Sequence, residues 1–403
     1  MKLLAILVEF PYPANHGGRC DISRRLEAFQ KLGWDVHAIT WTGGRLEAPI
    51  REGDLARMNS VVTDLELLEL DRGARRVLNL VRWPSQAAGR WPSHLERERL
   101  LRKYRSASAS FDAVWIDGIH AAPLGRWLAK QLAIPYFYRS HNIEFRYIGE
   151  QARLARGITR VSIAANLLGL RKLEEETLAE AALFFDISEP DLDYWRSKGL
   201  ENGRLLSTLA DPDMLELARS GDTETIASDI AFAGSLSLPN NLAGLEWYLA
   251  QVHPRVQKEI PDVNLLVAGR NPSRELVELV NKANGRVIAN PERMEPVLLG
   301  CKVAINPIFH GSGVNIKMID MMASGRPVVT TSKGMRGMPK EIVELLSVAD
   351  QADDMAVAII NVLKQPPDRS SLERRLAIVA KYFGLEGSRE SLETAAEFVR
   401  NQG

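Results

Sequence analysis

The chain has 403 residues, 45% of them hydrophobic and 25% charged, which is the composition of a globular protein with room for two domains. Its 51 basic and 51 acidic residues leave no net charge, so bulk electrostatics argue against a nucleic-acid-binding protein. Two distant cysteines, Cys20 and Cys301, give no disulfide framework and no zinc signature.

The N-terminal segment begins with an alternation of strands and helices. Apolar residues predict a strand over 3–8, a helix over 19–32 that ends at Gly33, and a strand over 35–40. The apolar start is too short for a signal peptide, and Glu9 interrupts it. No apolar run approaches the ~18 residues of a membrane-spanning helix, so we expect a cytoplasmic protein.

Cations are in excess at 72–105, where there are ten lysines and arginines but only two glutamates. Apolar side chains are interleaved with them, namely Leu78, Leu80, Val81, Trp83 and Trp91. This mixture is typical of a segment that touches the inner face of a membrane or an anionic lipid-linked partner. A solvated helix face is the alternative.

The N-terminal half continues with the same alternation. The predicted elements are strands over 113–116, 136–139 and 183–187 and helices over 124–132 and 161–182. Asp117 and His141 stand just after two of these strands. In parallel sheets ligands bind at the carboxyl ends of the strands, so both are candidate site residues. Ordinary hydrogen-bonded loop residues are the alternative.

The pattern restarts after the polar segment 207–228. Strands are predicted over 230–232, 263–268, 286–288 and 302–306, with helices over 242–258, 273–283 and 293–299 between them. Such alternation indicates two parallel, doubly wound α/β sheets. We divide the chain into an N-terminal domain, 1–210, and a C-terminal domain, 211–380. A last helix, 381–403, could cross back to the N-terminal domain.

The segment 309–331 is the most informative part of the sequence. It predicts a glycine turn, an apolar helix that ends at Gly325, and a strand. Lys317 and Asp320 lie on one face of this helix, where they need partners because unpaired buried charge is costly. They could pair with each other at a spacing of three. Alternatively, the start of the helix and Lys317 would bind a nucleotide diphosphate, with Asp320 on the ribose hydroxyls.

Seven short motifs occur in the order found in one family of enzymes. They are FPYP at 10–13 followed by GGR at 17–19, FDAVWID at 111–117, HNIE at 141–144, ISEPD at 187–191, FAGSL at 232–236, VAGRNP at 267–272, and the segment 311–329. Together they resemble the GT-B glycosyltransferases, and most closely the glycosyltransferase family 4 group of bacterial sugar transferases. The resemblance covers nearly the whole chain and implies two Rossmann-like domains that face a central cleft.

The resemblance implies that the C-terminal domain binds a nucleotide sugar and the N-terminal domain binds the acceptor. The implied donor-binding residues are Gly17, Gly18, Arg270, Gly311, Ser312, Gly313, Lys317 and Asp320. The implied catalytic residues are His141, Asp117, Lys317 and Asp320, and the implied acceptor-binding residues are His120, Asn142 and Glu144.

Some positions depart from the family pattern. Ser312 and Asp320 replace two glutamates that family members often carry, and Ser235, Asn240 and Asn241 occupy a loop where many members carry cations. Lys317 and Arg270 would therefore carry more of the charge interaction with the diphosphate.

Two Asp-x-Asp pairs, Asp191/Asp193 and Asp211/Asp213, could suggest a metal site. We interpret Asp191 as a helix-start residue and Asp211 as a structural residue beside Pro212 in the linker, and expect no metal and no cofactor besides the donor substrate. The sequence also contains no GxGxxG after the first strand and no P-loop motif, which disfavours a dinucleotide-dependent oxidoreductase and a P-loop NTPase.

The resulting hypothesis is a metal-independent, cytoplasmic glycosyltransferase of surface polysaccharide or glycoconjugate synthesis. It would move a sugar from a nucleotide diphosphate to a hydroxyl of a glycan or lipid-linked oligosaccharide, and the resemblance implies retention of anomeric configuration. The alternatives are a GT-B nucleotide-sugar epimerase and a catalytically silent scaffold that binds a glycan or a partner.

Overall fold

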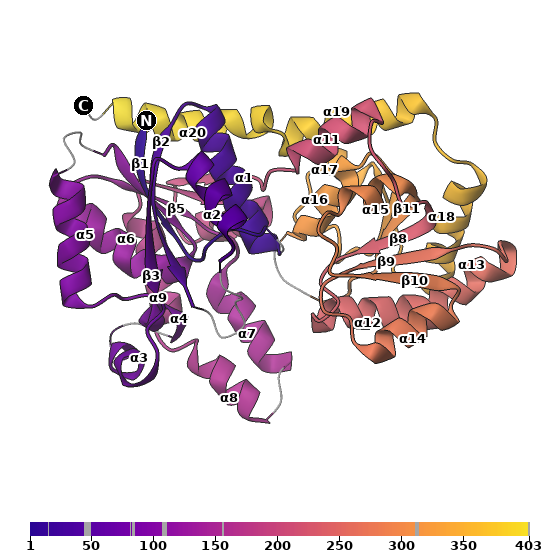
Figure 1. The fold of residues 1–403 in the computed structure, drawn as a ribbon, viewed down its shortest axis with the longest axis horizontal. Helices are drawn as coiled ribbons and strands as arrows, with labels where there is room; N and C mark the ends of the chain where they lie inside the picture. Colours follow the sequence, from indigo (N-terminus) through magenta and orange to yellow (C-terminus); the bar gives the residue numbers. More distant parts are fainter. Residues whose placement is uncertain are drawn as a thin grey trace. The chain divides into compact units, whose positions relative to one another are not determined.

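The computed structural model describes residues 1–14, 16–43, 50–80, 82, 85–106, 111–154, 157–310 and 314–401. They form two compact units, Met1–Ser207 with Arg389–Gly403, and Thr208–Ser388. Each unit contains one parallel sheet covered by helices (Figure 1). The expected fold of two Rossmann-like α/β domains is confirmed.

The sheet of the first unit has seven strands in the order β3-β2-β1-β4-β5-β6-β7. Their bounds are β1 (Lys2–Leu7), β2 (Asp35–Thr42), β3 (Asp64–Glu69), β4 (Ala113–Asp117), β5 (Tyr136–Arg139), β6 (Leu183–Asp186) and β7 (Gly203–Leu205). All neighbours are parallel, so β4, β5 and β6 end at one edge, with the charged residues Asp117, Arg139 and Asp186 as their last members.

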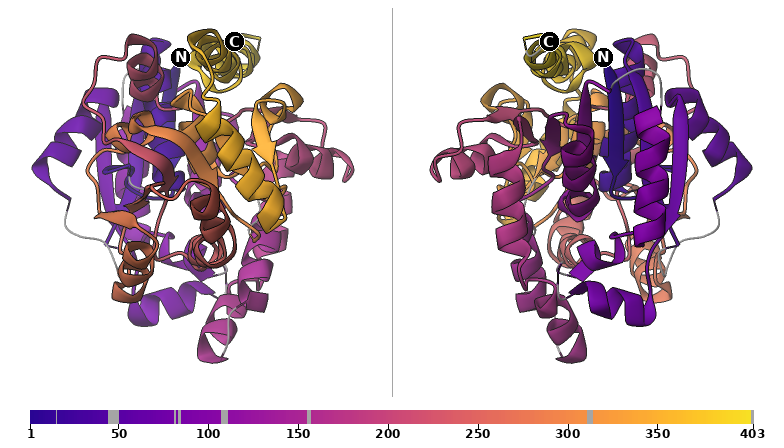
Figure 2. Two further views of the ribbon diagram at one scale, coloured as in Figure 1. Left: turned by 90° about the vertical axis from the view of Figure 1, so that its right-hand side faces the viewer. Right: turned by 90° about the vertical axis from the view of Figure 1, so that its left-hand side faces the viewer.

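Helices cover both faces of this sheet. They are α1 (Gly17–Lys31), α2 (Glu52–Val61), α3 (Gly73–Leu80), α4 (Ser85–Gly89), α5 (His94–Ser106), η1 (Ile119–Ala121), α6 (Ala122–Leu132), α7 (Glu144–Leu154), α8 (Gly157–Ala165), α9 (Leu170–Glu180) and α10 (Glu189–Arg196). Alternate residues of β1 point to opposite faces, so Leu4 and Ile6 pack with α5 and α6, while Leu3 and Ala5 pack with α1 and α2. Figure 1 shows these two helix layers, and Figure 2 shows α7 and α8 projecting from the unit.

Helix α6 packs very closely against β4. A Cβ added at Gly125 of α6 would lie 2.4 Å from Cγ1 of Ile116, closer than such atoms approach. The glycine therefore lets α6 lie flat on the strand that ends at Asp117.

The second unit repeats the design with six parallel strands in the order β10-β9-β8-β11-β12-β13. The strands are β8 (Ser228–Ala233), β9 (Leu265–Gly269), β10 (Gly285–Ala289), β11 (Cys301–Asn306), β12 (Val328–Thr330) and β13 (Leu346–Val348). The helices are α11 (Pro212–Ser220), α12 (Pro239–Trp247), η2 (Tyr248–Val252), α13 (His253–Glu259), α14 (Arg274–Lys282), α15 (Glu295–Gly300), α16 (Ile316–Ala323), α17 (Lys340–Val343), α18 (Ala352–Lys364) and α19 (Arg369–Phe383).

The last helix, α20 (Leu385–Arg400), starts in the second unit and continues in the first, where Leu392 and Ala395 join the apolar core. The hydroxyl of Ser391 donates to the carbonyl oxygen of Leu205 at 2.6 Å. The units therefore divide the chain between Ser207 and Thr208 and again between Ser388 and Arg389.

Two sequence predictions of helices were wrong in detail. The stretch predicted as one helix over 161–182 is two helices, α8 and α9, separated by a turn at Gly169 with φ of 73°. The stretch predicted over 242–258 contains a π-helical segment, η2, between α12 and α13. Among the described residues, no helix is both long and apolar enough to cross a membrane.

Candidate functional site

Five charged side chains gather at the carboxyl edge of the first sheet. Asp21 and Arg25 come from α1, Asp117 and Arg139 end β4 and β5, and His141 follows β5. We call these five residues the strand-end cluster. Four of them are at most 2% exposed, and three are at most 1% exposed. The side chain of His141 is 14% exposed, so it is the member that reaches solvent.

The strand-end cluster balances its own charges. Arg139 donates to both carboxylate oxygens of Asp21 at 3.2 Å, and Arg25 donates to Asp21 Oδ2 at 2.6 Å. Burial disfavours the charged form of Asp21, but the two guanidiniums outweigh it and hold the pKa of this carboxyl far below its usual range. The Asp21 carboxylate is therefore held inside the protein by two guanidiniums.

His141 lies between the two carboxylates. Its Nε2 is 2.6 Å from Asp117 Oδ1, which is a strong hydrogen bond, whereas its Nδ1 is 3.5 Å from Asp21 Oδ2, which is too long for one. Burial lowers the pKa of His141, but Asp117 and Asp21 more than offset this and raise it above the usual value. Asp117 thus holds the His141 ring through Nε2 and leaves Nδ1 for another partner.

Asn142 and Glu144 lie beside the cluster, in the loop that leads into α7. The backbone N–H groups of Glu144 and Phe145 donate to the carboxylate of Glu174 in α9, at 2.7 and 3.1 Å. Burial raises the pKa of the Glu144 carboxyl, although His141 and Asn142 work in the opposite direction. A fully buried glutamate therefore fixes the segment that carries the candidate acceptor-binding residues.

Asp186 stands at the end of the next strand and is fully buried. Burial raises its pKa to about 7, although the Ser140 hydroxyl, Arg139 and His141 act in the opposite direction. This carboxyl adds a group that titrates near neutral pH to the edge formed by β4, β5 and β6.

His120 does not join the strand-end cluster. It lies in η1, where burial, together with Arg90 and Arg76, lowers its pKa to about 3. This histidine is neutral at physiological pH, because protonation would place an additional charge among cations.

Gly17 and Gly18 form the start of α1. A Cβ at Gly18 would lie 3.4 Å from Glu9 Oε1, and Glu9 itself pairs with Arg19 at 3.0 Å and with His16 at 3.3 Å. The anion nearest this helix start is thus a side chain of the protein, with which an incoming phosphate would compete.

The second unit holds Lys317 near the carboxyl ends of its strands. The ammonium donates to Asn241 Oδ1 at 2.9 Å and lies 4.4 Å from the ring centre of Phe232. Nδ2 of Asn241 donates to the carbonyl oxygen of Ser235 at 2.7 Å, which fixes the amide. Burial lowers the pKa of Lys317 to about 7. The partner of the ammonium is therefore a neutral amide from α12.

Glycines shape the backbone around Lys317. A Cβ at Gly234 would lie 3.3 Å from Lys317 Nζ and 3.2 Å from Asn241 Nδ2, and a Cβ at Gly269 would lie 1.7 Å from the Gly234 carbonyl oxygen. The missing side chain at Gly269 lets the carboxyl ends of β8 and β9 approach each other, and the missing side chain at Gly234 leaves room for Lys317 and Asn241.

The remaining candidate donor residues lie nearby in the chain. Asp320 is one turn beyond Lys317 on α16 and is half-buried, and Arg270 follows directly after β9. The predicted phosphate cradle, Gly311, Ser312 and Gly313, lies outside the described residues. Asp191 lies in the first turn of α10, as predicted, whereas Asp211, which was predicted to lie in the linker, caps α11.

Sequence reasoning missed several residues of these sites. Asp21, Arg25 and Arg139 complete the strand-end cluster, Glu174 holds its loop, and Asn241 holds Lys317. A signal existed for the first two, because an Asp and an Arg four residues apart on an apolar helix face need buried partners.

Comparisons with known proteins agree with this architecture. Residues 21–206 match the family described as Glycosyl transferase 4-like domain, and residues 227–365 match the Glycosyl transferases group 1 family. The chain is a family 4-like GT-B glycosyltransferase. A relative, an uncharacterized 44.6 kDa protein in the cps region of Klebsiella pneumoniae, is 28% identical over 372 residues, which are 90% of this chain and 91% of that protein.

Solved structures of similar fold include other GT-B glycosyltransferases. Sucrose-phosphate synthase from Thermosynechococcus elongatus is 16% identical with a TM-score of 0.64, and all of both chains is covered. HepE from Anabaena, in complex with UDP and glucose, is 13% identical with a TM-score of 0.62, covering 98% of this chain and 100% of that one. At these sequence identities the similarity to the solved structures shows the fold alone.

Proposed function

We propose that this glycosyltransferase transfers a sugar from a UDP-sugar to a hydroxyl of a glycan or lipid-linked oligosaccharide during capsular polysaccharide synthesis. The choice of UDP is supported by HepE, which was solved with UDP and with UDP-glucose. The choice of pathway is supported by the relative in the cps region. Retention of anomeric configuration and independence from metal ions are parts of the same proposal.

The observation that carries the proposal is the state of Lys317. A desolvated ammonium is poorly stabilised by one neutral amide and one aromatic ring, and its pKa is lowered for this reason. A diphosphate beside it would supply the missing negative charge. Since α16 begins at Ile316, the positive end of its dipole would act on the same anion.

During transfer, the bond between the anomeric carbon and the diphosphate oxygen breaks, and its electron pair remains on the leaving diphosphate. The acceptor oxygen bonds to the anomeric carbon, and its proton passes to the leaving diphosphate. Lys317 and Arg270 would stabilise the charge on the leaving group. His141 would donate through Nδ1 to a substrate hydroxyl, while Asp117 positions the ring through Nε2.

The proposal needs no resident metal ion. Asp21, Asp117 and His141 have ligand atoms within 4.8 Å of one another, which is a possible spacing for metal ligands. However, Asp21 already holds two buried guanidiniums, which supply the positive charge that a metal ion would bring. A divalent cation at this position would meet strong repulsion from Arg25 and Arg139.

Contact with the inner membrane face through 72–105 also remains a proposal. Helix α3 exposes Val77 (63%) and Leu78 (71%), and Arg75 lies on the same helix. An exposed apolar surface among cations suits an anionic lipid surface. Trp91 is nearly buried and does not extend this surface, while Val81 and Trp83 lie outside the described residues.

The test is a donor screen that follows release of UDP from a panel of UDP-sugars, with binding of UDP measured by calorimetry. A glycosyltransferase of this kind binds UDP and releases it faster when an acceptor is present. An epimerase would convert the UDP-sugar without an acceptor, and a silent scaffold would bind no nucleotide. Either of these two results would overturn the proposal.

A further inference from the structure

A second recess lies in the first unit, away from the strand-end cluster. It has a volume of about 900 Å³, and α5, α6 and α9 contribute to its walls. Tyr136, the first residue of β5, lines it, whereas the strand-end cluster contains Arg139, the last residue of that strand. Among the described residues of the lining, none belongs to the strand-end cluster. We call this recess the α6 groove.

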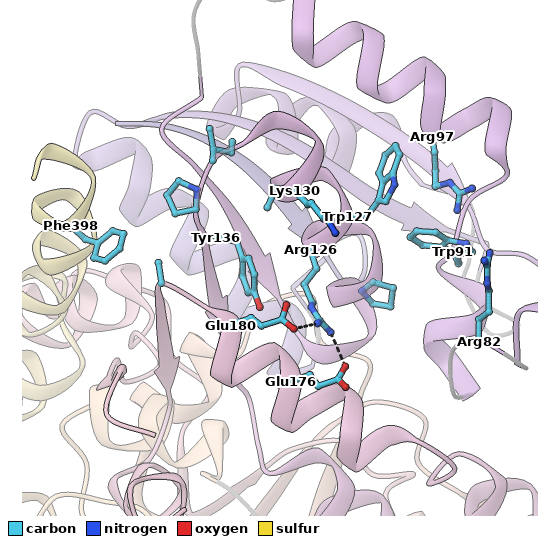
Figure 3. Close-up of a pocket in the computed structure, with 15 residues that line it drawn as sticks. Arg82, Trp91, Arg97, Arg126, Trp127, Lys130, Tyr136, Glu176, Glu180 and Phe398 are labelled. Carbon is cyan, nitrogen blue, oxygen red and sulfur yellow. Dashed lines mark hydrogen bonds and ion pairs between the residues drawn. The ribbon is translucent and has the colours of Figure 1, made fainter. Parts of the chain in front are cut away.

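One end of the α6 groove is aromatic. The rings of Trp91 and Trp127 meet edge to face, with centres 6.3 Å apart and planes at 88°. The guanidinium of Arg97 lies 4.1 Å from the ring centre of Trp91 and 5.5 Å from that of Trp127. Figure 3 shows Arg97 and the two indoles together, with Arg82 beside Trp91. Trp127 is half-buried, so part of its ring is available for stacking.

This end of the groove carries cations that the protein does not neutralise. In the part of the chain that the structure describes, the side chains of Arg82, Arg97 and Lys130 form no ion pair and no hydrogen bond, and Glu98 acts on Arg97 only from beyond ion-pair distance. Burial lowers the pKa of Arg97, and the neighbouring Arg82 lowers it further. An incoming anion would therefore find one partly desolvated guanidinium, Arg97, already stacked on indole rings, and two exposed cations beside it.

The rest of the groove carries both positive and negative charges. Arg126 lies between Glu176 and Glu180, at 3.6 and 2.7 Å, as the dashed lines in Figure 3 show. These paired groups offer donors and acceptors for hydroxyl groups. The groove thus combines a flat aromatic surface, unpaired cations and a hydroxyl-binding polar network in one concave site.

We propose that the α6 groove binds an acidic segment of a glycan, with a sugar carboxylate on Arg97 and Arg82 and a sugar ring against Trp127. The choice of a glycan as the ligand rests on the proposed function. A bilayer surface fits less well, because the groove is concave and its polar end carries two carboxylates. Bound here, an acidic polymer would be held at a second place, apart from the site of sugar transfer.

The experiment measures binding of an unsulfated chondroitin hexasaccharide, which carries glucuronate, to the full-length protein by calorimetry. Maltohexaose serves as the neutral probe and phosphatidylglycerol vesicles as the lipid probe. We expect Arg97→Gln and Trp127→Ala to weaken binding of the acidic hexasaccharide by about tenfold or more, the loss of one charge-assisted contact. The matched control is Arg102→Gln, which removes an exposed arginine of the same helix outside the groove.

The double variant Arg82→Gln/Lys130→Gln changes only exposed side chains and should also weaken binding without loss of folding. The proposal is overturned if the wild-type protein ignores the acidic hexasaccharide, if Arg97→Gln binds it unchanged, or if the groove variants lose vesicle binding alone. UDP binding is measured in the same samples. Because Lys317 lies outside the groove, intact UDP binding without glycan binding would refute this inference and leave the proposed function standing.

Discussion

The strand-end cluster and the Lys317 site solve the problem of buried charge in opposite ways. In the first unit, Asp21 and Asp117 meet Arg25, Arg139 and His141, so the protein supplies its own counterions. In the second unit, Lys317 has a neutral amide and a ring as its neighbours. The first arrangement stabilises the fold of the unit, and the second favours binding of an anionic ligand.

This difference separates stability from binding. Removal of one member of a balanced buried network leaves the others uncompensated, which costs folding free energy. Removal of an ammonium that is already poorly solvated leaves the free energy of unfolding unchanged or raises it. Only the interaction with the ligand is lost. Four predictions test this division, and they follow from the largest expected effect to the smallest.

Asp21→Ala should reduce the free energy of unfolding by about 3–5 kcal/mol, because Arg25 and Arg139 would remain buried without their main carboxylate. Urea denaturation measures this loss. The control is Asp353→Ala, which removes an exposed aspartate paired with Arg255 and should cost at most about 1 kcal/mol. Equal losses in the two variants would contradict the role assigned to the strand-end cluster.

Lys317→Met should slow sugar transfer by about 10²–10³-fold, the usual cost of removing one stabilising donor from a developing charge. Its melting temperature should be unchanged or higher at pH 6, where the wild-type ammonium is charged and desolvated. The matched control is Lys302→Met, which replaces an exposed lysine of β11 and should keep wild-type activity. A melting temperature that falls with activity would indicate a structural role.

Binding of UDP should weaken as pH rises above 7. The pKa of Lys317 is about 7 without ligand and should rise when a diphosphate lies beside it, so binding takes up a proton in this range. The affinity should fall by up to about tenfold per pH unit between pH 7.5 and 9. Calorimetry in buffers of different ionisation enthalpy measures the proton uptake, and Lys317→Met should abolish it.

Glu174→Ala should cost about 1 kcal/mol in unfolding free energy, because two backbone N–H groups at the start of α7 would lose their acceptor. Glu174→Gln should cost less, since burial and Glu144 raise the pKa of this carboxyl well above its usual value and an amide oxygen can accept the same bonds. Chemical denaturation of both variants checks the order. The reverse order would mean that the negative charge itself is required.

The sequence predicted most of the fold because apolar periodicity alone determines the alternation of strands and helices. It missed β3, where Asp64, Glu66 and Glu69 dilute the apolar pattern of an edge strand. It also predicted one helix where Gly169 makes a left-handed turn between α8 and α9. Such breaks depend on a single backbone angle, which composition does not reveal.

The candidate sites were predicted less completely than the fold. Asp117 and His141 could be identified because strand ends converge at one edge of a parallel sheet. The partnership of Lys317 with Asn241 joins residues 76 positions apart, and no local spacing points to it. The sequence had instead allowed Lys317 to pair with Asp320, three residues away on the same helix.

The crowding around Gly269 has a consequence for mutational scanning of this enzyme. Any side chain there would collide with the carbonyl oxygen of Gly234, 1.7 Å away, whatever substrate is present. Intolerance to substitution at position 269 would therefore report backbone fit and would say nothing about donor recognition. Arg270, the adjacent residue, is the position where a scan could distinguish loss of chemistry from loss of folding.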